Sequence, residues 1–185
     1  AMKIDAVVMR HPSPGSSVHL TKYIKSIVIN AGDGAHEHPT QAILDMMSLK
    51  EKFGKIRGLK IGIIGDIAHS RVARSNIYGL IKMGAEVMVC GSPTLIPIEI
   101  ISLGVKVSYN LDEVLDWADA INVLRIQLER MNRGLFPSVR EYRKLFGITD
   151  ERLQKHNKEI VVLHPGPMNR GVEIDSSVAD SKSAI

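Results

Sequence analysis

The sequence predicts an α/β fold in which helices cover both faces of a mainly parallel, Rossmann-like sheet, giving three layers. Short β-branched runs alternate along the chain with segments of helical periodicity, which is the pattern of repeated βα units. Two of these runs, at residues 60–64 and 159–163, are apolar almost throughout. Such continuity is typical of central strands that are buried on both faces.

The elements follow from these patterns. We expect strands at residues 5–9, 27–30, 59–64, 86–90, 105–108, 120–124 and 160–163, and helices at 17–25, 39–53, 70–83, 111–118, 138–146 and 150–155. The helix at 39–53 is the clearest, because Pro39 suits a first helical turn and apolar side chains then recur at helical spacing. Ser70 and Thr149 are expected N-caps of the helices that follow them.

Composition narrows the class of protein. The 185 residues are 44% hydrophobic, 24% charged and 4% aromatic, with a net charge of +4. No apolar run reaches the ~18 residues of a membrane span, and no basic stretch alternates with aromatics, so we expect neither a membrane nor a nucleic-acid partner. Cys90 is the single cysteine, which predicts a cytoplasmic protein without intrachain disulfides and a small buried side chain at that position.

Polar motifs follow the first two predicted strands. Arg10 ends the first strand, where open α/β sheets bind ligands, and its guanidinium suits a phosphate or carboxylate. The second strand leads through a glycine-rich turn into the Pro39 helix, whose free N–H groups attract anions. His38 and Gln41 lie one turn apart at this helix start, so both can reach one ligand.

The segment at residues 62–71 looks like a dinucleotide fingerprint but departs from it. Ile67 stands where the motif needs glycine, which makes a nicotinamide-dependent dehydrogenase a weak alternative. Arg71 instead falls in the first turn of the next helix, where a cation opposes the helix dipole. That position favours an arginine held there for an anionic ligand.

Two later segments complete the set. Alternation after the strand at 120–124 puts Arg125 and Gln127 on one side, where they can bind a carboxylate, while Glu129 and Arg130 are expected structural partners. The run His164-Pro165-Gly166-Pro167 follows the last strand, and its carbonyl groups can accept from an amine. His164 by itself is more often structural.

The implied ligand is multiply anionic and needs no cofactor. His36-Glu37-His38 suggests zinc at first sight, but it lacks the i,i+4 spacing of a helical zinc pair and no third ligand cluster is evident. We therefore expect no metal site.

Taken together, these motifs resemble the aspartate carbamoyltransferases, and the resemblance covers nearly the whole chain. The motifs stand in that family's order: Arg10-His11-Pro12, Asn30-Ala31-Gly32-Asp33-Gly34 with His38-Pro39-Thr40-Gln41, Gly65-Asp66 through Ser70-Arg71, Arg125-Ile126-Gln127 with Glu129-Arg130, and His164-Pro165-Gly166-Pro167. Ornithine carbamoyltransferases usually carry a cysteine in the last motif, so the aspartate branch fits better.

The resemblance implies carbamoyl transfer from carbamoyl phosphate to the α-amine of L-aspartate in pyrimidine synthesis, without a cofactor. It assigns carbamoyl phosphate to Arg10, His38 and Gln41, with Arg10 and His38 as the catalytic pair that polarises the carbonyl. It assigns aspartate to Arg71, Arg125, Gln127 and the segment Pro165, Gly166 and Pro167. It also implies a homotrimer for the full-length enzyme.

The family's Ser-Thr-Arg-Thr-Arg phosphate loop and its lysine-bearing loop do not occur in this sequence. We therefore expect a truncated chain: residues 1–38 as the end of a carbamoyl phosphate-binding domain, and 39–185 as an aspartate-binding domain that stops before its final helix. Such a fragment should be inactive alone. The alternatives are a non-catalytic carbamoyltransferase-like binding domain and a carbamoyltransferase for another amine, such as ornithine.

Overall fold

The structure is a computed structural model that describes residues 3–126, 138–156 and 158–185. Its elements run in the order β1 (Ala6–His11), α1 (Ser16–Leu20), β2 (Ile27–Asp33), α2 (Pro39–Phe53), β3 (Lys60–Ile64), α3 (Arg71–Lys82), β4 (Glu86–Cys90), the 3₁₀ helices η1 (Pro93–Leu95) and η2 (Ile98–Leu103), β5 (Lys106–Ser108), α4 (Leu111–Trp117), β6 (Ala120–Val123), α5 (Val139–Phe146), α6 (Asp150–Gln154), β7 (Val161–Leu163) and α7 (Ser176–Ala179). No helix in these ranges is long and apolar enough to cross a membrane.

The larger sheet has five strands in the order β5-β4-β3-β6-β7, and every neighbouring pair is parallel. The chain builds outward from β3 through β4 to β5, and then returns to the other side of β3 as β6 and β7. The strand order therefore reverses between β3 and β6, and open α/β sheets bind ligands at the carboxyl ends of such a pair.

Apolar side chains pack on both faces of this sheet. One buried cluster joins Leu49 of α2 and Ile77 of α3 to the sheet, and the other joins Val114 of α4 and Phe146 of α5 to the opposite face. The predicted three-layer α/β architecture is therefore confirmed. Cys90 is fully buried in the second cluster, and burial raises the pKa of its thiol to about 12, as expected of a small core side chain.

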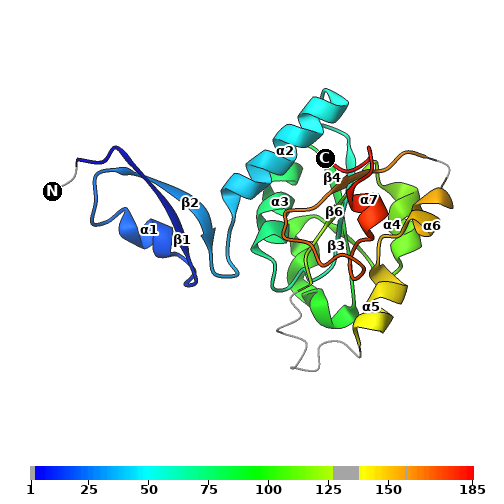
Figure 1. Cartoon of the computed structure of the whole chain (residues 1–185). Coiled ribbons are helices and arrows are strands. Elements are labelled where there is room, and N and C mark those ends of the chain that lie inside the picture. Colours follow the sequence, from blue (N-terminus) through cyan, green and yellow to red (C-terminus); the bar gives the residue numbers. More distant parts are fainter. Residues whose placement is uncertain (1–2, 127–137, 157) are drawn as a thin grey trace.

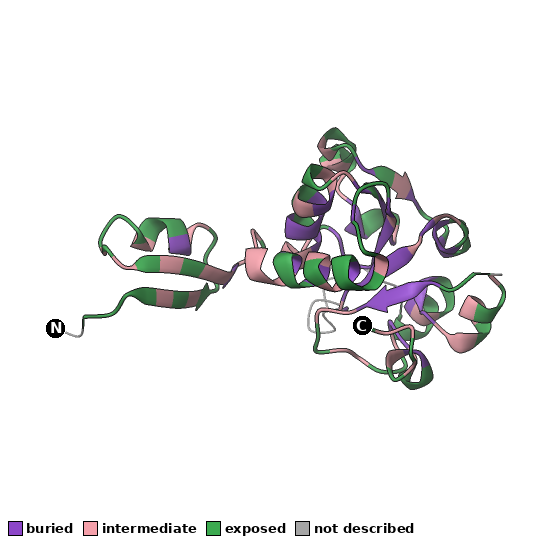
Figure 2. Cartoon of the chain, turned by 90° about the horizontal axis from the view of Figure 1, so that it is seen from above, coloured by how far each residue is buried: buried purple, intermediate pink, exposed green. Residues whose placement is uncertain are grey.

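The first strands form a separate, smaller unit. β1 and β2 pair in parallel as a two-stranded sheet, with α1 in the connection between them. This unit stands apart from the main body and reaches it through α2 (Figure 1), and most of its surface is exposed (Figure 2). Val8 and Ile27 are both 68% exposed, so the small sheet buries little apolar surface of its own.

The predicted helix starts are confirmed at atomic detail. Pro39 is the first residue of α2, the Ser70 hydroxyl accepts from the Ala73 N–H at 3.1 Å, and the Thr149 hydroxyl accepts from the Arg152 N–H at 3.2 Å. These caps satisfy N–H groups that a helix leaves without an internal partner.

Three local expectations were wrong. The helix expected at 17–25 ends at Leu20, because Ser17 is its only buried residue and little packing supports further turns. Two 3₁₀ helices, Pro93–Leu95 and Ile98–Leu103, were not predicted, since Pro93 and Pro97 interrupt the helical pattern there. Several strands also begin or end one to three residues away from the predicted limits, the largest difference being β2, which runs on to Asp33.

Candidate functional site

A pocket of about 490 Å³ opens at the carboxyl ends of β3 and β6, at the point where the strand order reverses. It draws on residues that are far apart in the sequence. The lining consists of Arg10, Pro12, Gly34, Ala35, His38, Gln41, Asp66, His69, Ser70, Arg71, Val72, Leu124, Arg125, Pro165, Gly166 and Pro167. The small sheet and the main body both contribute to it.

The structure brings the described candidate site residues together in this one pocket. Eight of them line it: Arg10, His38, Gln41, Arg71, Arg125, Pro165, Gly166 and Pro167. Gln127, with Glu129 and Arg130, lies outside the described residues. The roles assigned to these side chains remain predictions, but their common location is what a shared ligand requires.

Two arginines shape the electrostatics of the pocket. Arg71 donates from Nη1 to the carbonyl oxygen of Gly34 at 3.3 Å, and its guanidinium lies over the turn at Gly32. Burial and the neighbouring charge of Arg10 lower the pKa of Arg71, although Asp33 acts in the opposite sense. Arginine stays protonated under these conditions, so the crowded cations favour an anionic ligand.

His38 is a neutral hydrogen-bond donor in this setting. Burial lowers its pKa, and the charges of Arg71 and Arg10 lower it further. As the N-cap of α2, its Nδ1 accepts from the Gln41 N–H at 3.4 Å and lies 3.2 Å from the Thr40 hydroxyl. With Nδ1 in use as an acceptor, the proton of the neutral ring is on Nε2, which can donate to a ligand oxygen.

Asp33 fixes the turn under Arg71, a role that sequence reasoning missed. Its carboxylate, 1% exposed, accepts from Gly15 N at 2.7 Å, Asn30 Nδ2 at 3.1 Å and Glu37 N at 3.0 Å, and it lies 3.2 Å from His36 Nδ1. Burial opposes ionisation, but these hydrogen bonds outweigh it and lower the pKa of Asp33 to about 2. The acid between two glycines was the available signal, although its partners are not visible in the motif.

Asp66 and His69 form a carboxylate–imidazole pair in the lining of the pocket, which was also not predicted. The Asp66 carboxylate lies 2.9 Å from His69 Nδ1 and accepts from the His69 N–H at 3.1 Å. Both residues lie in the loop between β3 and α3, so their place after the carboxyl end of a central strand was the signal in the sequence. The pair shapes the loop that leads to Ser70 and Arg71.

The segment Pro165–Pro167 is supported by polar side chains on either side of it in the sequence, His164 and Asn169. His164 Nδ1 accepts from the Gly166 N–H at 2.9 Å, and its Nε2 lies 3.4 Å from Glu173, whose side chain is fully buried. Asn169 Nδ2 donates to the Ile126 carbonyl at 2.8 Å, which ties this segment to the one that carries Arg125. His164 therefore has the structural role expected of it.

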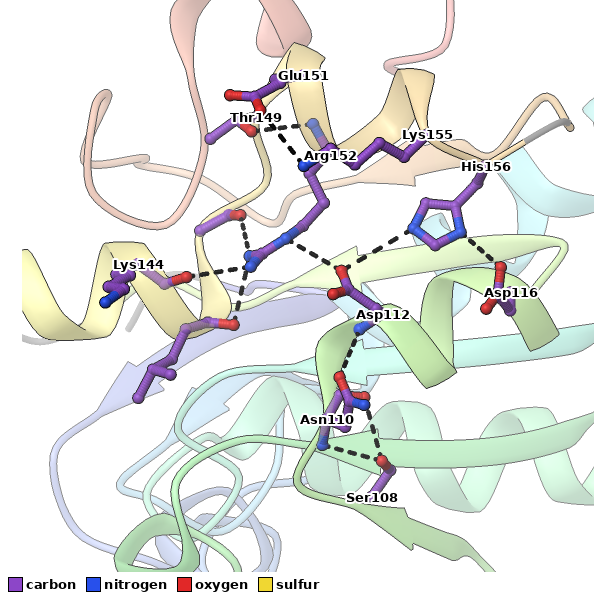
Figure 3. Close-up of polar contacts among 12 residues, drawn as sticks. Ser108, Asn110, Asp112, Asp116, Lys144, Thr149, Glu151, Arg152, Lys155 and His156 are labelled. Atoms are coloured by element: carbon purple, nitrogen blue, oxygen red, sulfur yellow. Dashed lines mark hydrogen bonds and ion pairs between the residues drawn. The ribbon is translucent and has the colours of Figure 1, made fainter.

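A second basic cavity, of about 410 Å³ between α5 and α6, is lined in part by Arg143 and Arg152, whose guanidinium groups already have partners. Arg152 donates to the carbonyls of Lys144, Leu145 and Gly147 at 3.0–3.3 Å and contacts Asp112 at 3.2 Å (Figure 3). Arg143 contacts Asp175 at 2.7 Å. Arg152 thus caps the carboxyl end of α5 by hydrogen bonds to its last carbonyl groups. The position of Arg152 in this cavity therefore has a structural explanation.

The described residues contain no group of three side chains that could hold a metal ion. His36, from the run that first suggested zinc, contacts Asp33. The pocket is lined by three arginines, and its one described carboxylate, Asp66, is engaged by His69, so the lining as a whole suits anionic substrates rather than a cation.

Two family profiles match the chain. The Asp/Orn binding domain of aspartate/ornithine carbamoyltransferases matches residues 57–185, and the carbamoyl-P binding domain of the same enzymes matches residues 1–51. The domain boundary expected between residues 38 and 39 remains a prediction.

Named relatives are similar over the whole chain. The aspartate carbamoyltransferase catalytic subunit of Christiangramia forsetii is 58% identical over 185 residues, which is 100% of this chain and 60% of that protein. That of Desulforamulus reducens is 60% identical over 179 residues, 97% of this chain and 57% of that protein. The chain thus spans about 60% of the length of the curated relatives that it matches.

Solved structures agree. Aspartate transcarbamoylase from Trypanosoma cruzi in complex with carbamoyl phosphate superimposes with a TM-score of 0.84 at 27% identity, covering 98% of this chain and 60% of that one. The phosphate complex of the same enzyme gives a TM-score of 0.83 at 29% identity, covering 97% and 60%. Sequence and fold agree in the assignment, and the chain belongs to the aspartate/ornithine carbamoyltransferase family.

Proposed function

We propose that this chain supplies the aspartate-binding part of an enzyme that transfers the carbamoyl group of carbamoyl phosphate to the α-amine of L-aspartate. The products are N-carbamoyl-L-aspartate and phosphate, in pyrimidine biosynthesis. One observation carries the proposal: a single pocket collects Arg10, His38, Gln41, Arg71 and Arg125 at the reversal of the strand order. Three cations in one pocket suit two anionic substrates bound side by side.

The chemistry needs only binding and electrostatics. The amine attacks the carbamoyl carbon, a C–N bond forms, the C–O bond to phosphate breaks, and the departing phosphate can take the amine proton. Negative charge builds on the carbonyl oxygen, where the Arg10 guanidinium and the Nε2–H of neutral His38 would stabilise it. A protonated His38 would add a further positive charge to a crowded site, which the lowered pKa opposes.

The remaining residues would orient the acceptor. We assign the aspartate carboxylates to Arg71 and Arg125, and by family resemblance to Gln127. The carbonyl groups of Pro165, Gly166 and Pro167 would accept from the amine at the junction of the two substrates. Holding both reactants in line supplies much of the rate acceleration in such a transfer.

We further propose that residues 1–38 belong to the carbamoyl phosphate domain and residues 39–185 to the aspartate domain. By the same resemblance we propose that the full-length enzyme is a homotrimer and that the 185-residue chain by itself has negligible transferase activity, and from the single cysteine, Cys90, that the protein is cytoplasmic. The chain spans about 60% of its curated relatives, and the family's main phosphate loop does not occur in it.

The first test is the thermal midpoint of the chain during separate titrations with L-aspartate, succinate, carbamoyl phosphate, phosphate and L-ornithine. A ligand at 100 times its Kd stabilises by about 2.7 kcal/mol, or roughly 5–10 °C for a chain of this size. We expect a rise with the dicarboxylates and none with ornithine. A rise with ornithine alone would reverse the substrate assignment.

A matched pair of variants locates the effect. Arg71→Gln should abolish the stabilisation by dicarboxylates, whereas Arg74→Gln changes the same charge on the same helix at an exposed position that does not line the pocket. Loss in both variants would mean a general charge effect rather than a site at Arg71. Turnover by the chain alone, near that of an intact enzyme, would contradict the proposed inactivity.

A further inference from the structure

A buried acid lies directly behind the pocket. Asp45, on α2, is 5% exposed, and its carboxylate accepts from three carboxamide groups: Gln41 Nε2 at 2.8 Å, Asn76 Nδ2 at 2.6 Å and Asn122 Nδ2 at 2.8 Å. Asn76 and Asn122 are 1% and 2% exposed. Of these three partners only Gln41 lines the pocket.

The carboxylate decides which way each of these amides faces. All three amides turn their nitrogens toward the Asp45 oxygens, which accept from each of them. The side-chain oxygens of Asn76 and Asn122 have no partner within the part of the chain that the structure describes. Leaving a buried acceptor unpaired costs about 1–3 kcal/mol. Their orientation therefore follows from the demand of Asp45 and not from a competing donor.

Asp45 orients the Gln41 amide in the same way. With Nε2 committed to Asp45, the carbonyl oxygen is the part of this amide that is left to accept from a ligand. Reversal of the amide would present an N–H donor in its place. The hydrogen-bonding character of the pocket wall at Gln41 thus depends on an acid that does not line the pocket.

Asp45 also joins the elements that carry the site. Its partners lie on α2, on α3, which begins with Arg71, and on β6, which ends just before Arg125. A single group therefore contacts each of the three segments whose relative placement the pocket requires. Burial raises the pKa of Asp45, although the three amide hydrogen bonds act in the opposite sense.

We propose that Asp45 is a positioning residue, which holds the Gln41 carboxamide so that its carbonyl oxygen, and not its N–H group, meets the ligand's N–H donor. The role assigned to the ligand rests on the proposed function, and the orientation of Gln41 does not. The competing explanation is that Asp45 only fastens α2 to α3 and β6. The two explanations differ in what happens to Gln41.

The Asp45→Asn variant separates them. If the introduced carboxamide kept its oxygen toward Asn76 and Asn122, its nitrogen would face Gln41, whose own amide would then have to turn over. Asn122→Ala is the matched control, because it removes a neighbouring hydrogen bond to Asp45 and leaves the bond to Gln41 in place. Thermal midpoints of all chains would show how far each variant loses stability.

The first readout is the side-chain amide signal of Gln41 in ¹⁵N NMR spectra of the 185-residue chain without ligand. In the wild type its bonded proton should exchange with water at least about tenfold more slowly than those of the exposed Gln154, as one hydrogen bond implies. That protection should be lost in Asp45→Asn and kept in Asn122→Ala. Equal exchange at Gln41 and Gln154 in the wild type, a measurement that needs no variant to fold, would overturn the proposal.

The second readout is the affinity for carbamoyl phosphate, measured by titration on the wild type, Asp45→Asn, Gln41→Ala and the double variant. We expect each single variant to weaken binding about tenfold, the value of one hydrogen bond. The double variant should be no weaker than Gln41→Ala, because Asp45 acts through Gln41. Additive losses would show that Asp45 acts by another route and would overturn the proposal.

The two readouts separate the two hypotheses. If the wild-type chain binds no carbamoyl phosphate while Gln41 is protected in an Asp45-dependent way, the ligand role given to Gln41 fails for this chain and the orientation of Gln41 by Asp45 stands. If binding is normal and Gln41 shows no dependence on Asp45, the proposed function stands and the role of Asp45 is refuted.

Discussion

Replacing Asp33 by asparagine should remove a defined part of the stability of the small β1–β2 unit. The difference between the usual pKa of 3.8 and the pKa of about 2 in the folded chain corresponds to about 2.5 kcal/mol. Because the folded-state pKa is the lower one, this contribution is complete above about pH 4 and is lost as the pH falls through 2. Asp33 is 1% exposed, so solvent does little to weaken it.

The assay is native-state hydrogen exchange at the two backbone N–H groups that donate to the Asp33 carboxylate, those of Gly15 and Glu37. In the wild type the free energy of opening at both amides should be constant above pH 5 and fall by about 2 kcal/mol toward pH 2. In Asp33→Asn it should begin lower by about that amount and show no such fall. Asp5→Asn, an exposed acid on the same unit, is the control.

A wild-type opening free energy that is the same at pH 6 and pH 2 would refute this reasoning. It would mean that the carboxylate contributes no net free energy to the turn. An Asp33→Asn chain with the same free energy of opening as the wild type would lead to the same conclusion. A loss of equal size in Asp5→Asn would point to the net charge of the unit rather than to the hydrogen bonds.

Three further predictions concern the pocket and its supports. Gly32→Ala should weaken dicarboxylate binding at least about tenfold in a thermal titration, because the added Cβ would lie 2.7 Å from Arg71 Cζ at a φ of +115°. Gly15→Ala is the control for the backbone strain alone, since Gly15 has a φ of +77° and its added Cβ would meet nothing within 4 Å. This control should leave dicarboxylate binding unchanged. Arg152→Met should lower the free energy of unfolding by about 2 kcal/mol in urea titration through loss of its carbonyl and Asp112 contacts, and an unchanged midpoint would show that water replaces them. Cys90 should resist a thiol reagent at pH 8 until the chain unfolds, since its pKa is about 12 and its side chain is fully buried; rapid labelling of the native chain would contradict this.

Much of the architecture could be predicted from local patterns. Pro39 marked the start of α2, and Ser70 and Thr149 were confirmed as caps, because each signal involves residues within one helical turn. The pocket could be predicted from polar residues at strand ends, since parallel strands bring these ends to one edge of the sheet.

The supports of the pocket could not be predicted in the same way. Asp33 accepts from Gly15, 18 residues earlier, and Asp45 accepts from Asn122, 77 residues later. A lone acid in a turn or a helix carries no signal for partners that only the tertiary fold brings near. Periodicity also overestimated α1, where exposure and not sequence preference ends the helix.

The small sheet has a consequence for how the site would be lost. Arg10 comes from β1, whereas Arg71 and Arg125 belong to the main body, so the pocket is complete only while both units are folded. An isolated two-stranded sheet is at best marginally stable in water, and this one is largely exposed (Figure 2). Local opening of β1 and β2 would therefore dismantle the anion site while the five-stranded sheet stayed intact. In the 185-residue chain, ligand binding should then disappear at a lower denaturant concentration than the circular dichroism of the main body, and loss of binding on heating would not require the main body to unfold.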